Sequence, residues 1–274
     1  MADYAITLQV WRGKDVSEHN YAPVERQRRM LDYINVNRTV HLQELASHFA
    51  ISEATARRDL DELSRQGAVI RTHGGAMRME KSTAYESQYQ ERLDQQQQEK
   101  EKIALEAARL VKNGDTVFID AGTTAFFIAK AISHLERITI ITNDLFTAAQ
   151  LEMRPSGRIM VTGGMRRSMY HELVGAVAED FIRSTHADIA FIGVDGIDLM
   201  GNVCSSNFEE MGVKRLMLQT ATRSVIVADH QKIGRTALVR ICDLKDADLL
   251  ITDSAIPPER LKKLRKVACD IILA

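Results

Sequence analysis

Two adjacent arginines, Arg57 and Arg58, could contact an anionic polymer, and a cationic run with two glycines, Arg-Thr-His-Gly-Gly, follows them at 71–75. A guanidinium is planar and can donate two hydrogen bonds at once, either to the acceptors of guanine or to a phosphate. Glycine lets a backbone approach a ligand closely. These residue types predict contacts with nucleic-acid phosphates and base edges.

The elements that must position the arginines follow from the spacing of apolar residues. Such residues recur at helical intervals in three consecutive segments: Met30, Leu31 and Ile34; Leu42, Leu45, Ala46 and Phe49; Ala56, Leu60 and Leu63. Residues 50–52 leave room only for a sharp turn, and Ser52 is a good N-cap for the third helix. The β-prone residues 68–70 and the cationic run predict a short hairpin. This order is typical of a winged helix-turn-helix, whose third helix reads the major groove.

The same residues have simpler explanations. Adjacent arginines on a helix commonly form a solvated surface, and three short helices can pack together without binding DNA. Between residues 24 and 79 the chain contains arginine but no lysine, and acidic residues nearly balance these arginines. Charge alone therefore does not decide, and the combined order of the elements favours DNA binding.

From Asn113 onward, buried strands alternate with amphipathic helices, which predicts an α/β domain with a mostly parallel sheet. The expected strands are 116–120, 138–142, 158–162, 189–194, 224–228, 249–252 and 270–273. The expected helices are 123–132, 145–151, 174–183, 209–220 and 258–266, and the glutamine-rich run at 95–101 leads into another that ends near Leu110. Such sheets bind ligands at the carboxyl ends of their strands.

Glycine and polar residues stand at three of those strand ends. Gly122, Thr123 and Thr124 lie at an expected helix N-terminus, which favours anions. Asn143 and the pair at 163–164 follow the next two strands. Gly-Thr-Thr also caps ordinary helices, but three such turns on one sheet edge predict a binding site, with phosphate as the best-matched group.

Charged residues follow the later strands. These are Asp195, Asp198, Glu210, Lys214 and Lys232. Carboxylates at a strand end can accept hydrogen bonds from sugar hydroxyls, whereas Asp-Gly pairs also form ordinary turns. Lys232 lies in a cationic loop that either meets an anionic ligand or is simply solvated.

Length and composition set further bounds. A chain of 274 residues with a formal net charge of −1 suits two domains. No stretch approaches a membrane span and no signal-peptide pattern is present, which predicts a cytoplasmic protein whose three cysteines are reduced. The cysteines and histidines lack metal-ligand spacing and no Walker motif occurs, so we expect no metal, no cofactor and no nucleotide hydrolysis.

Three segments, RQRRMLDYI, LQELASHFAISEATARRDLDEL and GAVIRTHGGA, closely resemble the DNA-binding domain of DeoR-type bacterial transcription regulators. The family's Ser, Thr, Arg-Arg-Asp-Leu and Arg-x-x-Gly-Gly signature is present from Ser52 to Gly75. The resemblance implies a set of residues that contact DNA: His41, Ser52, Thr55, Arg57, Arg58, Arg71, His73 and Gly74.

The second half resembles the sensor domain of the same family, through DAGTT, TGG, GVDGID, EE with a following lysine, and VADHQKIGR. That domain is similar to ribose-5-phosphate isomerase, which implies a phosphorylated sugar as the effector. The residues implied to bind it are Gly122, Thr123, Thr124, Asn143, Gly163, Gly164, Asp195, Asp198, Glu210, Lys214 and Lys232. The isomerase has a second acid after its first Asp and a Lys-Gly-Gly-Gly run after the second. Here Gly196 follows Asp195, and no lysine lies between Asp198 and Lys214, so we expect binding without proton transfer and no catalytic residue.

We therefore expect an α+β two-domain protein: a tail at 1–23, a winged helix-turn-helix at 24–79 with its helix-turn-helix at about 41–60, a linker at 80–101, and an α/β sensor at 102–274. Its expected function is repression of a sugar or sugar-derivative operon, relieved by a phosphorylated sugar. Two half-sites imply a homo-oligomer, a dimer or a tetramer. The alternatives are an activator with the same residues, or an isomerase with an appended DNA-binding module whose acid–base set would be Asp195, Asp198 and Glu210.

Overall fold

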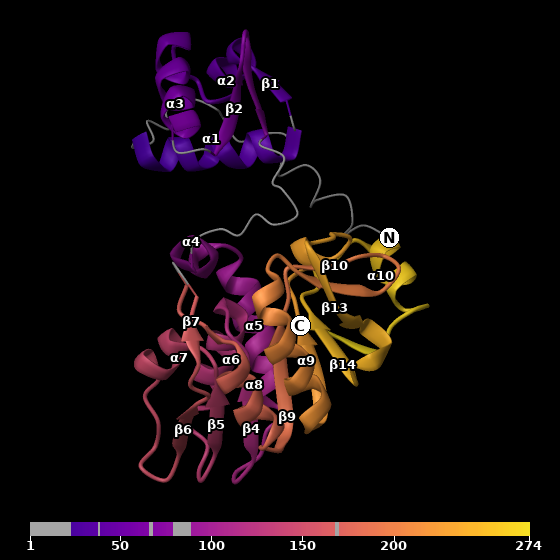
Figure 1. Cartoon of the computed structure of the whole chain (residues 1–274). Coiled ribbons are helices and arrows are strands. Elements are labelled where there is room, and N and C mark those ends of the chain that lie inside the picture. Colours follow the sequence, from indigo (N-terminus) through magenta and orange to yellow (C-terminus); the bar gives the residue numbers. More distant parts are fainter. Residues whose placement is uncertain (1–22, 38, 66–67, 79–88, 168–169) are drawn as a thin grey trace, which may run out of the picture. The chain divides into compact units, whose positions relative to one another are not determined.

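The structure is a computed structural model that describes residues 23–37, 39–65, 68–78, 89–167 and 170–274. The expected tail at 1–23 lies outside these residues except for Pro23, as does the part of the expected linker from 80 to 88. The chain divides into two compact units, Met1–Lys81 (unit 1) and Ser82–Ala274 (unit 2). Figure 1 shows the helices and strands of each unit.

Unit 1 is a winged helix-turn-helix, as the sequence predicts. Its helices are α1 (Pro23–Asn37), α2 (Leu42–His48) and α3 (Glu53–Arg65), and its strands are β1 (Thr39–His41), β2 (Val69–Thr72) and β3 (Gly75–Arg78). The apolar residues that set the helical spacing form one core, with Met30, Ile34, Leu45 and Leu60 fully buried. β1 was not expected, because three residues are too few to show alternation. It pairs with β3 and makes the wing three-stranded, in the order β1-β3-β2.

Unit 2 is built on a seven-stranded sheet in which every neighbouring pair is parallel. Its order is β15-β14-β12-β9-β4-β5-β6. The strands are β4 (Thr116–Ile119), β5 (Thr139–Thr142), β6 (Arg158–Val161), β9 (Ala187–Gly193), β12 (Ala221–Val227), β14 (Leu249–Thr252) and β15 (Asp270–Leu273). All seven were expected from their short apolar runs, although β6 and β15, at the two edges of the sheet, are partly exposed.

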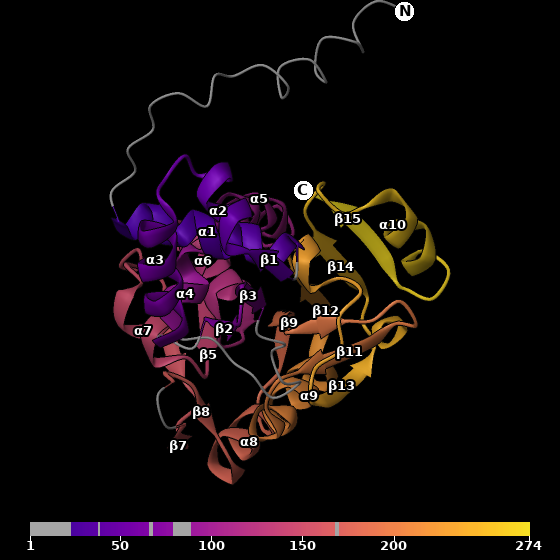
Figure 2. The same cartoon turned by 90° about the horizontal axis from the view of Figure 1, so that it is seen from above.

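Helices cover both faces of this sheet (Figure 2). One face carries α5 (Gln97–Ala108), α6 (Thr123–Ile132) and α7 (Leu145–Gln150), and the other carries α8 (Ala176–Arg183), α9 (Met211–Thr220) and α10 (Pro258–Leu264). Successive residues of a strand point to opposite faces of the sheet and therefore belong to different cores. Val117 and Ile119 pack on the α5–α6 side, whereas Phe118 packs on the α8–α9 side.

The direction of winding reverses between β4 and β9, which are neighbours in the sheet. The chain leaves β4 through α6 on one face and leaves β9 through α9 on the opposite face. At such a switch point the loops diverge to opposite sides, and ligands of open α/β sheets bind in the crevice between them. The carboxyl ends of β4 and β9 therefore mark the position of a candidate site.

Several elements of unit 2 depart from the expectation. A three-stranded antiparallel sheet, β10 (Gly196–Ile197), β11 (Asn202–Ser205) and β13 (Val239–Asp243), and a hairpin, β7 (Met165–Arg166) with β8 (Leu173–Val174), were not expected. Val174 belongs to β8, and α8 begins at Ala176. Within the expected linker, α4 (Tyr89–Asp94) and the first residues of α5 are helical. None of the described helices is long and apolar enough to cross a membrane.

Candidate functional site

The N-terminus of α3 is fixed by Ser52, as the sequence predicts. The Ser52 hydroxyl accepts a hydrogen bond from the Thr55 backbone N–H at 3.2 Å, and the two hydroxyl oxygens lie 2.9 Å apart. Ala50 has a positive φ of 50° in the preceding turn. This conformation lets the backbone reverse sharply, so that α3 starts at a defined angle to α2.

The Arg-Arg-Asp-Leu run divides between the surface and the core. Arg57 and Arg58 are exposed, whereas Asp59 is 3% exposed and Leu60 is fully buried. Asp59 accepts hydrogen bonds from Arg26 and Gln27 of α1. The two arginines are therefore presented outward by a helix that the following aspartate anchors.

The wing returns to the same side of α3. Arg71 donates to Asp61 at 2.9 Å and to the carbonyl oxygen of Gly75, so this arginine joins the wing to α3 within the protein. Gly74 accepts from the Leu42 backbone N–H at 2.8 Å. A Cβ at Gly75 would lie 2.0 Å from the Val40 carbonyl oxygen, so the close approach of β1 and β3 requires this glycine.

A groove separates the N-terminal end of α3 from the wing. Five of the residues expected to contact DNA line this groove: His41, Arg57, Arg71, His73 and Gly74. Its other lining residues are Leu42, Gln43, Glu53 and Gly75. His41, His73 and Gly74 are exposed. Basic and small residues from three separate elements thus face one space, as a surface that follows a nucleic-acid backbone requires.

In unit 2, the turn after β4 forms an open helix N-terminus. Gly122 is the N-cap of α6 with φ 134°, and no atom of the described residues lies within 4 Å of the place a Cβ would occupy there. Thr123 is buried and Thr124 is half-buried. Free backbone N–H groups and the helix dipole at such an end attract anions.

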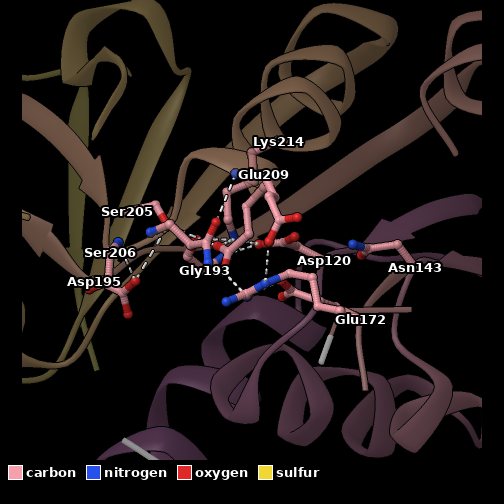
Figure 3. A network of polar contacts seen from close by, with 12 residues as sticks. Asp120, Asn143, Glu172, Gly193, Asp195, Ser205, Ser206, Glu209 and Lys214 are labelled. Carbon is pink, nitrogen blue, oxygen red and sulfur yellow. Dashed lines mark hydrogen bonds and ion pairs between the residues drawn. The ribbon is translucent and has the colours of Figure 1, made fainter. Parts of the chain in front are cut away.

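Asp120, directly before this turn, spans the switch point (Figure 3). Its Oδ2 accepts from the Gly193 backbone N–H at 3.0 Å and from Lys214 Nζ at 2.5 Å. Burial raises the pKa of Asp120 to about 6, against the opposing effect of the Lys214 ammonium. Burial by itself would lower the pKa of Lys214, but Asp120, Glu210 and Glu172 outweigh it and raise that pKa. Lys214 is therefore held as a cation.

A second buried cation, Arg167, extends the network. It pairs with Glu172 and, at 2.7 Å, with Glu210, which also accepts from the Ser205 hydroxyl at 2.9 Å. Burial and the neighbouring Glu210 raise the pKa of Glu172 to about 9. Three buried acids, Asp120, Glu172 and Glu210, thus share two buried cations.

Asp195 and Lys232 form the other side of the site. Asp195 accepts from the Ser206 backbone N–H at 2.8 Å, and its Oδ1 lies 3.6 Å from Lys232 Nζ. Burial raises the pKa of Asp195, but Lys232 and the Ser206 N–H outweigh it and lower the pKa to about 2. Lys232 ends a short 3-10 helix, His230–Lys232, capped by Asp229. Two strand-end loops are thereby held together by charge.

The structure joins four of the eleven effector residues proposed from the sequence in one network of side-chain contacts. Lys214, Glu210, Asp195 and Lys232 are connected through Asp120 and Ser205. Asp198 is not: its carboxylate accepts from Met200 and Asn202 in the β10–β11 turn. The turn-forming alternative therefore accounts for Asp198.

Three further predicted residues lie against the β7–β8 hairpin or the start of α8. Gly164 has φ 115°, and a Cβ there would lie 2.7 Å from the Val174 carbonyl oxygen, so it is packed against the start of α8. Gly163 has φ 71°. Asn143 is buried and donates to the Leu173 carbonyl oxygen at 3.2 Å.

The sequence reasoning missed Asp120, Arg167 and Glu172. Asp120 had a usable signal, because a carboxylate at the end of an otherwise apolar buried strand must find a partner. Arg167 and Glu172 had none, since the hairpin β7–β8 that positions them has no recognisable sequence pattern.

Comparisons with known proteins agree with both units. Residues 26–82 match the DeoR-like helix-turn-helix domain, and residues 95–254 match the DeoR C terminal sensor domain. The chain is 31% identical over 252 residues to the HTH-type transcriptional regulator GolR of Listeria innocua, covering 92% of this chain and 99% of GolR. It is 33% identical over 233 residues to the glycerol-3-phosphate regulon repressor of Escherichia coli, covering 85% and 92%.

Among solved structures, ribose 5-phosphate isomerase from Plasmodium falciparum aligns at 17% identity with a TM-score of 0.35, over 48% of this chain and 51% of that chain. No conclusion about activity follows from a similarity of that size. The two domain matches and the relatives that span the chain agree with the winged helix-turn-helix and the α/β unit. The chain therefore belongs to the DeoR family of DNA-binding transcriptional regulators.

Proposed function

We propose that this protein is a repressor of a sugar-related operon and that a phosphorylated sugar bound to unit 2 releases it from its operator. One observation carries the second half of the proposal: an open helix N-terminus at Gly122 lies at the switch point of a doubly wound sheet, beside buried polar side chains. That arrangement suits a ligand with an anionic end and hydroxyl groups. The relative named as the glycerol-3-phosphate regulon repressor supports the first half.

The proposed DNA surface comprises the lining of the groove in unit 1 and the exposed α3 residues. Arg57 and Arg58 are assigned to bases or phosphates, with His41, Ser52, Thr55, His73 and Gly74 around them. Arg71 is assigned a smaller direct role, because its guanidinium already pairs with Asp61 and Gly75.

The proposed effector site places the phosphate at the N-terminus of α6, with Thr123, Thr124 and the ammonium of Lys232 nearby. Asn143 and Asp195 are assigned to the sugar. Glu210 and Lys214 are assigned to holding the site's other side chains in place, since both are buried and paired with each other. We propose no catalytic role: a lysine whose pKa is raised by three acids does not take a proton from a substrate.

The repressor is proposed to act as a homo-oligomer, because helix-turn-helix proteins read paired half-sites with two copies. Its target is DNA, so we place it in the cytoplasm. An effector shifts the operator equilibrium only through different affinities for the free and DNA-bound states.

The test begins with an operator fragment selected by the purified protein from random duplexes. Glycerol 3-phosphate, pentose 5-phosphates and hexose 6-phosphates are then screened by thermal shift, since a ligand that binds the folded state raises its stability. We expect a compound that raises the melting temperature also to weaken operator binding in a gel-shift titration. If operator binding is tight but no phosphorylated sugar changes it, the sugar-phosphate effector is wrong and the DNA-binding assignment stands.

A further inference from the structure

Among the described residues of unit 2, four buried side-chain oxygens have no hydrogen-bond partner, and they belong to Tyr89, Asp120, Asn143 and Thr252. Two of them, Oδ1 of Asp120 and Oδ1 of Asn143, lie at the ends of adjacent strands, in side chains that are 1% and 2% exposed. A buried acceptor without a donor is costly, and buried polar groups in proteins are almost always satisfied. Each of these atoms therefore indicates a missing donor.

The two residues occupy equivalent positions on neighbouring strands. Ile119 of β4 pairs with Thr142 of β5 in a parallel ladder, and Asp120 and Asn143 are the next residues along. Parallel neighbours are about 4.8 Å apart. Both side chains point to the α8–α9 face, because Phe118 and Ile141, two positions earlier, belong to that core. Figure 3 shows Asn143 beside Asp120, on the side away from Asp195.

Both side chains are held by their other polar atom. Asp120 Oδ2 is bound by Lys214 and the Gly193 backbone N–H. The Asn143 amide nitrogen donates to the Leu173 carbonyl oxygen. Because a carbonyl oxygen can only accept, the nitrogen must face it, and the side-chain oxygen of Asn143 is the atom without a partner among the described residues. The two leftover atoms are therefore both acceptors, in fixed positions.

The missing group must supply donors close to the proposed phosphate end of the site. Asp120 is two residues before Gly122, so their Cα atoms are within about 7 Å. A hydroxyl one or two carbons from a phosphate held at the N-terminus of α6 spans that distance.

We propose that Asp120 and Asn143 form a hydroxyl-binding subsite, in which the two free oxygens accept hydrogen bonds from neighbouring hydroxyl groups of a phosphorylated polyol. The proposal rests on the proposed function and adds to it the part of the site that reads the sugar. Such a subsite disfavours a phosphate ester without hydroxyls, because that ligand leaves both buried acceptors unpaired.

The experiment compares three probes on the full chain by calorimetry: inorganic phosphate, glycerol 3-phosphate and n-propyl phosphate. The last two share a phosphate and three carbons and differ in their hydroxyls. We expect the parent to bind glycerol 3-phosphate about ten- to a hundredfold more tightly than propyl phosphate, because one hydrogen bond to a charged group changes an affinity by about that factor. A parent that binds both esters equally overturns the proposal without any variant.

The variants are Asp120→Asn and Asn143→Leu, both of similar size to the parent residue. Each is expected to reduce the preference for glycerol 3-phosphate about tenfold or more and to leave the affinity for inorganic phosphate within about twofold. Thr252→Val is the matched control, because Thr252 also carries a buried oxygen without a partner among the described residues. Thr252 stands at the end of β14, which β12 and β9 separate from β4 in the sheet. This variant is expected to change neither affinity.

An unchanged preference in both folded variants would show that water or a proton on Asp120 satisfies the two acceptors, and the proposal would be wrong. Equal loss of phosphate and glycerol phosphate would place the acceptors in a structural role, which also overturns it. If no phosphorylated compound, including ribose 5-phosphate and glucose 6-phosphate, binds the parent, then the proposed effector class itself fails, a result distinct from both.

Discussion

Arg26 Nε lies 2.6 Å from Asp59 Oδ2, and this largely buried ion pair joins the first helix of unit 1 to the helix that carries Arg57 and Arg58. Gln27 adds a second donor to the same carboxylate at 2.9 Å. The aspartate that follows the two exposed arginines is thus a structural residue, and it sets the angle at which those arginines are presented.

The first prediction is that Asp59→Ala destabilises unit 1. Removing one member of a buried pair leaves the other charge uncompensated, which costs about 3–5 kcal/mol. Asp61→Ala is the control on the same helix, since the Asp61–Arg71 pair is more exposed and worth at most about 1 kcal/mol. Urea unfolding followed by circular dichroism measures both, and equal losses in the two variants would contradict the structural role of Asp59.

The second prediction concerns the exposed arginines. Arg57→Ala and Arg58→Ala should each weaken operator binding by about 1–3 kcal/mol where the arginine reads a base, and relax the preference at one operator position. A phosphate contact would instead weaken all sequences alike and reduce the salt dependence. Arg65→Ala, at the far end of α3 and paired with Glu62, is the control.

Gel-shift titrations at two salt concentrations measure the effect, with circular dichroism to verify the fold. Because both arginines are exposed, we expect the free energy of unfolding to stay within about 0.5 kcal/mol of the parent. Full operator affinity in both variants would exclude α3 as the reading helix.

The sequence predicts elements well where one local pattern decides them. The three helices of unit 1 have a clear apolar period, the seven sheet strands are short apolar runs, and Ser52 has the chemistry of a cap. The elements that were missed depend on distant partners instead. β1 exists because β3 lies beside it, and the β10–β11–β13 sheet joins residues separated by a helix and a central strand. The same reason hid Arg167, whose partners Glu172 and Glu210 are on other elements.

The third prediction uses two glycines at opposite ends of β4. Gly114 and Gly122 both have positive φ, 91° and 134°, and both have open space where a Cβ would lie. Alanine at either position should cost about 1–3 kcal/mol of backbone strain. Only Gly122→Ala places a methyl group in the proposed phosphate cradle, so only this variant should lose the response to the effector while still binding the operator.

The response is measured as release of operator DNA in an effector titration. A Gly122→Ala protein that leaves DNA at the parent's effector concentration would place the phosphate elsewhere. Loss of response in Gly114→Ala as well would attribute the effect to a weakened sheet.

The fourth prediction is a pH dependence that comes from Asp195. Its pKa of about 2 in the folded protein is below the ordinary value of 3.8, so the charged carboxylate stabilises the fold by about 2 kcal/mol above pH 4. This contribution is present above the unfolded pKa and is lost as the pH falls toward 2. Parent and Asp195→Asn should therefore differ by about 2 kcal/mol at pH 6, and the difference should shrink at pH 3.

Urea unfolding at the two pH values measures that difference directly. Asp180→Asn is the control, because Asp180 is exposed on α8 and pairs with Arg183, an exposed arginine of the same helix. It should leave the stability close to that of the parent at both pH values, since exposed pairs contribute little. Lys232→Met should reproduce part of the Asp195→Asn effect, because the ammonium 3.6 Å away is the main favourable charge on the carboxylate. A difference between parent and Asp195→Asn that stays constant with pH would mean that Asp195 acts through the shape of its side chain, and that its pairing with Lys232 does not hold the two loops of the site together.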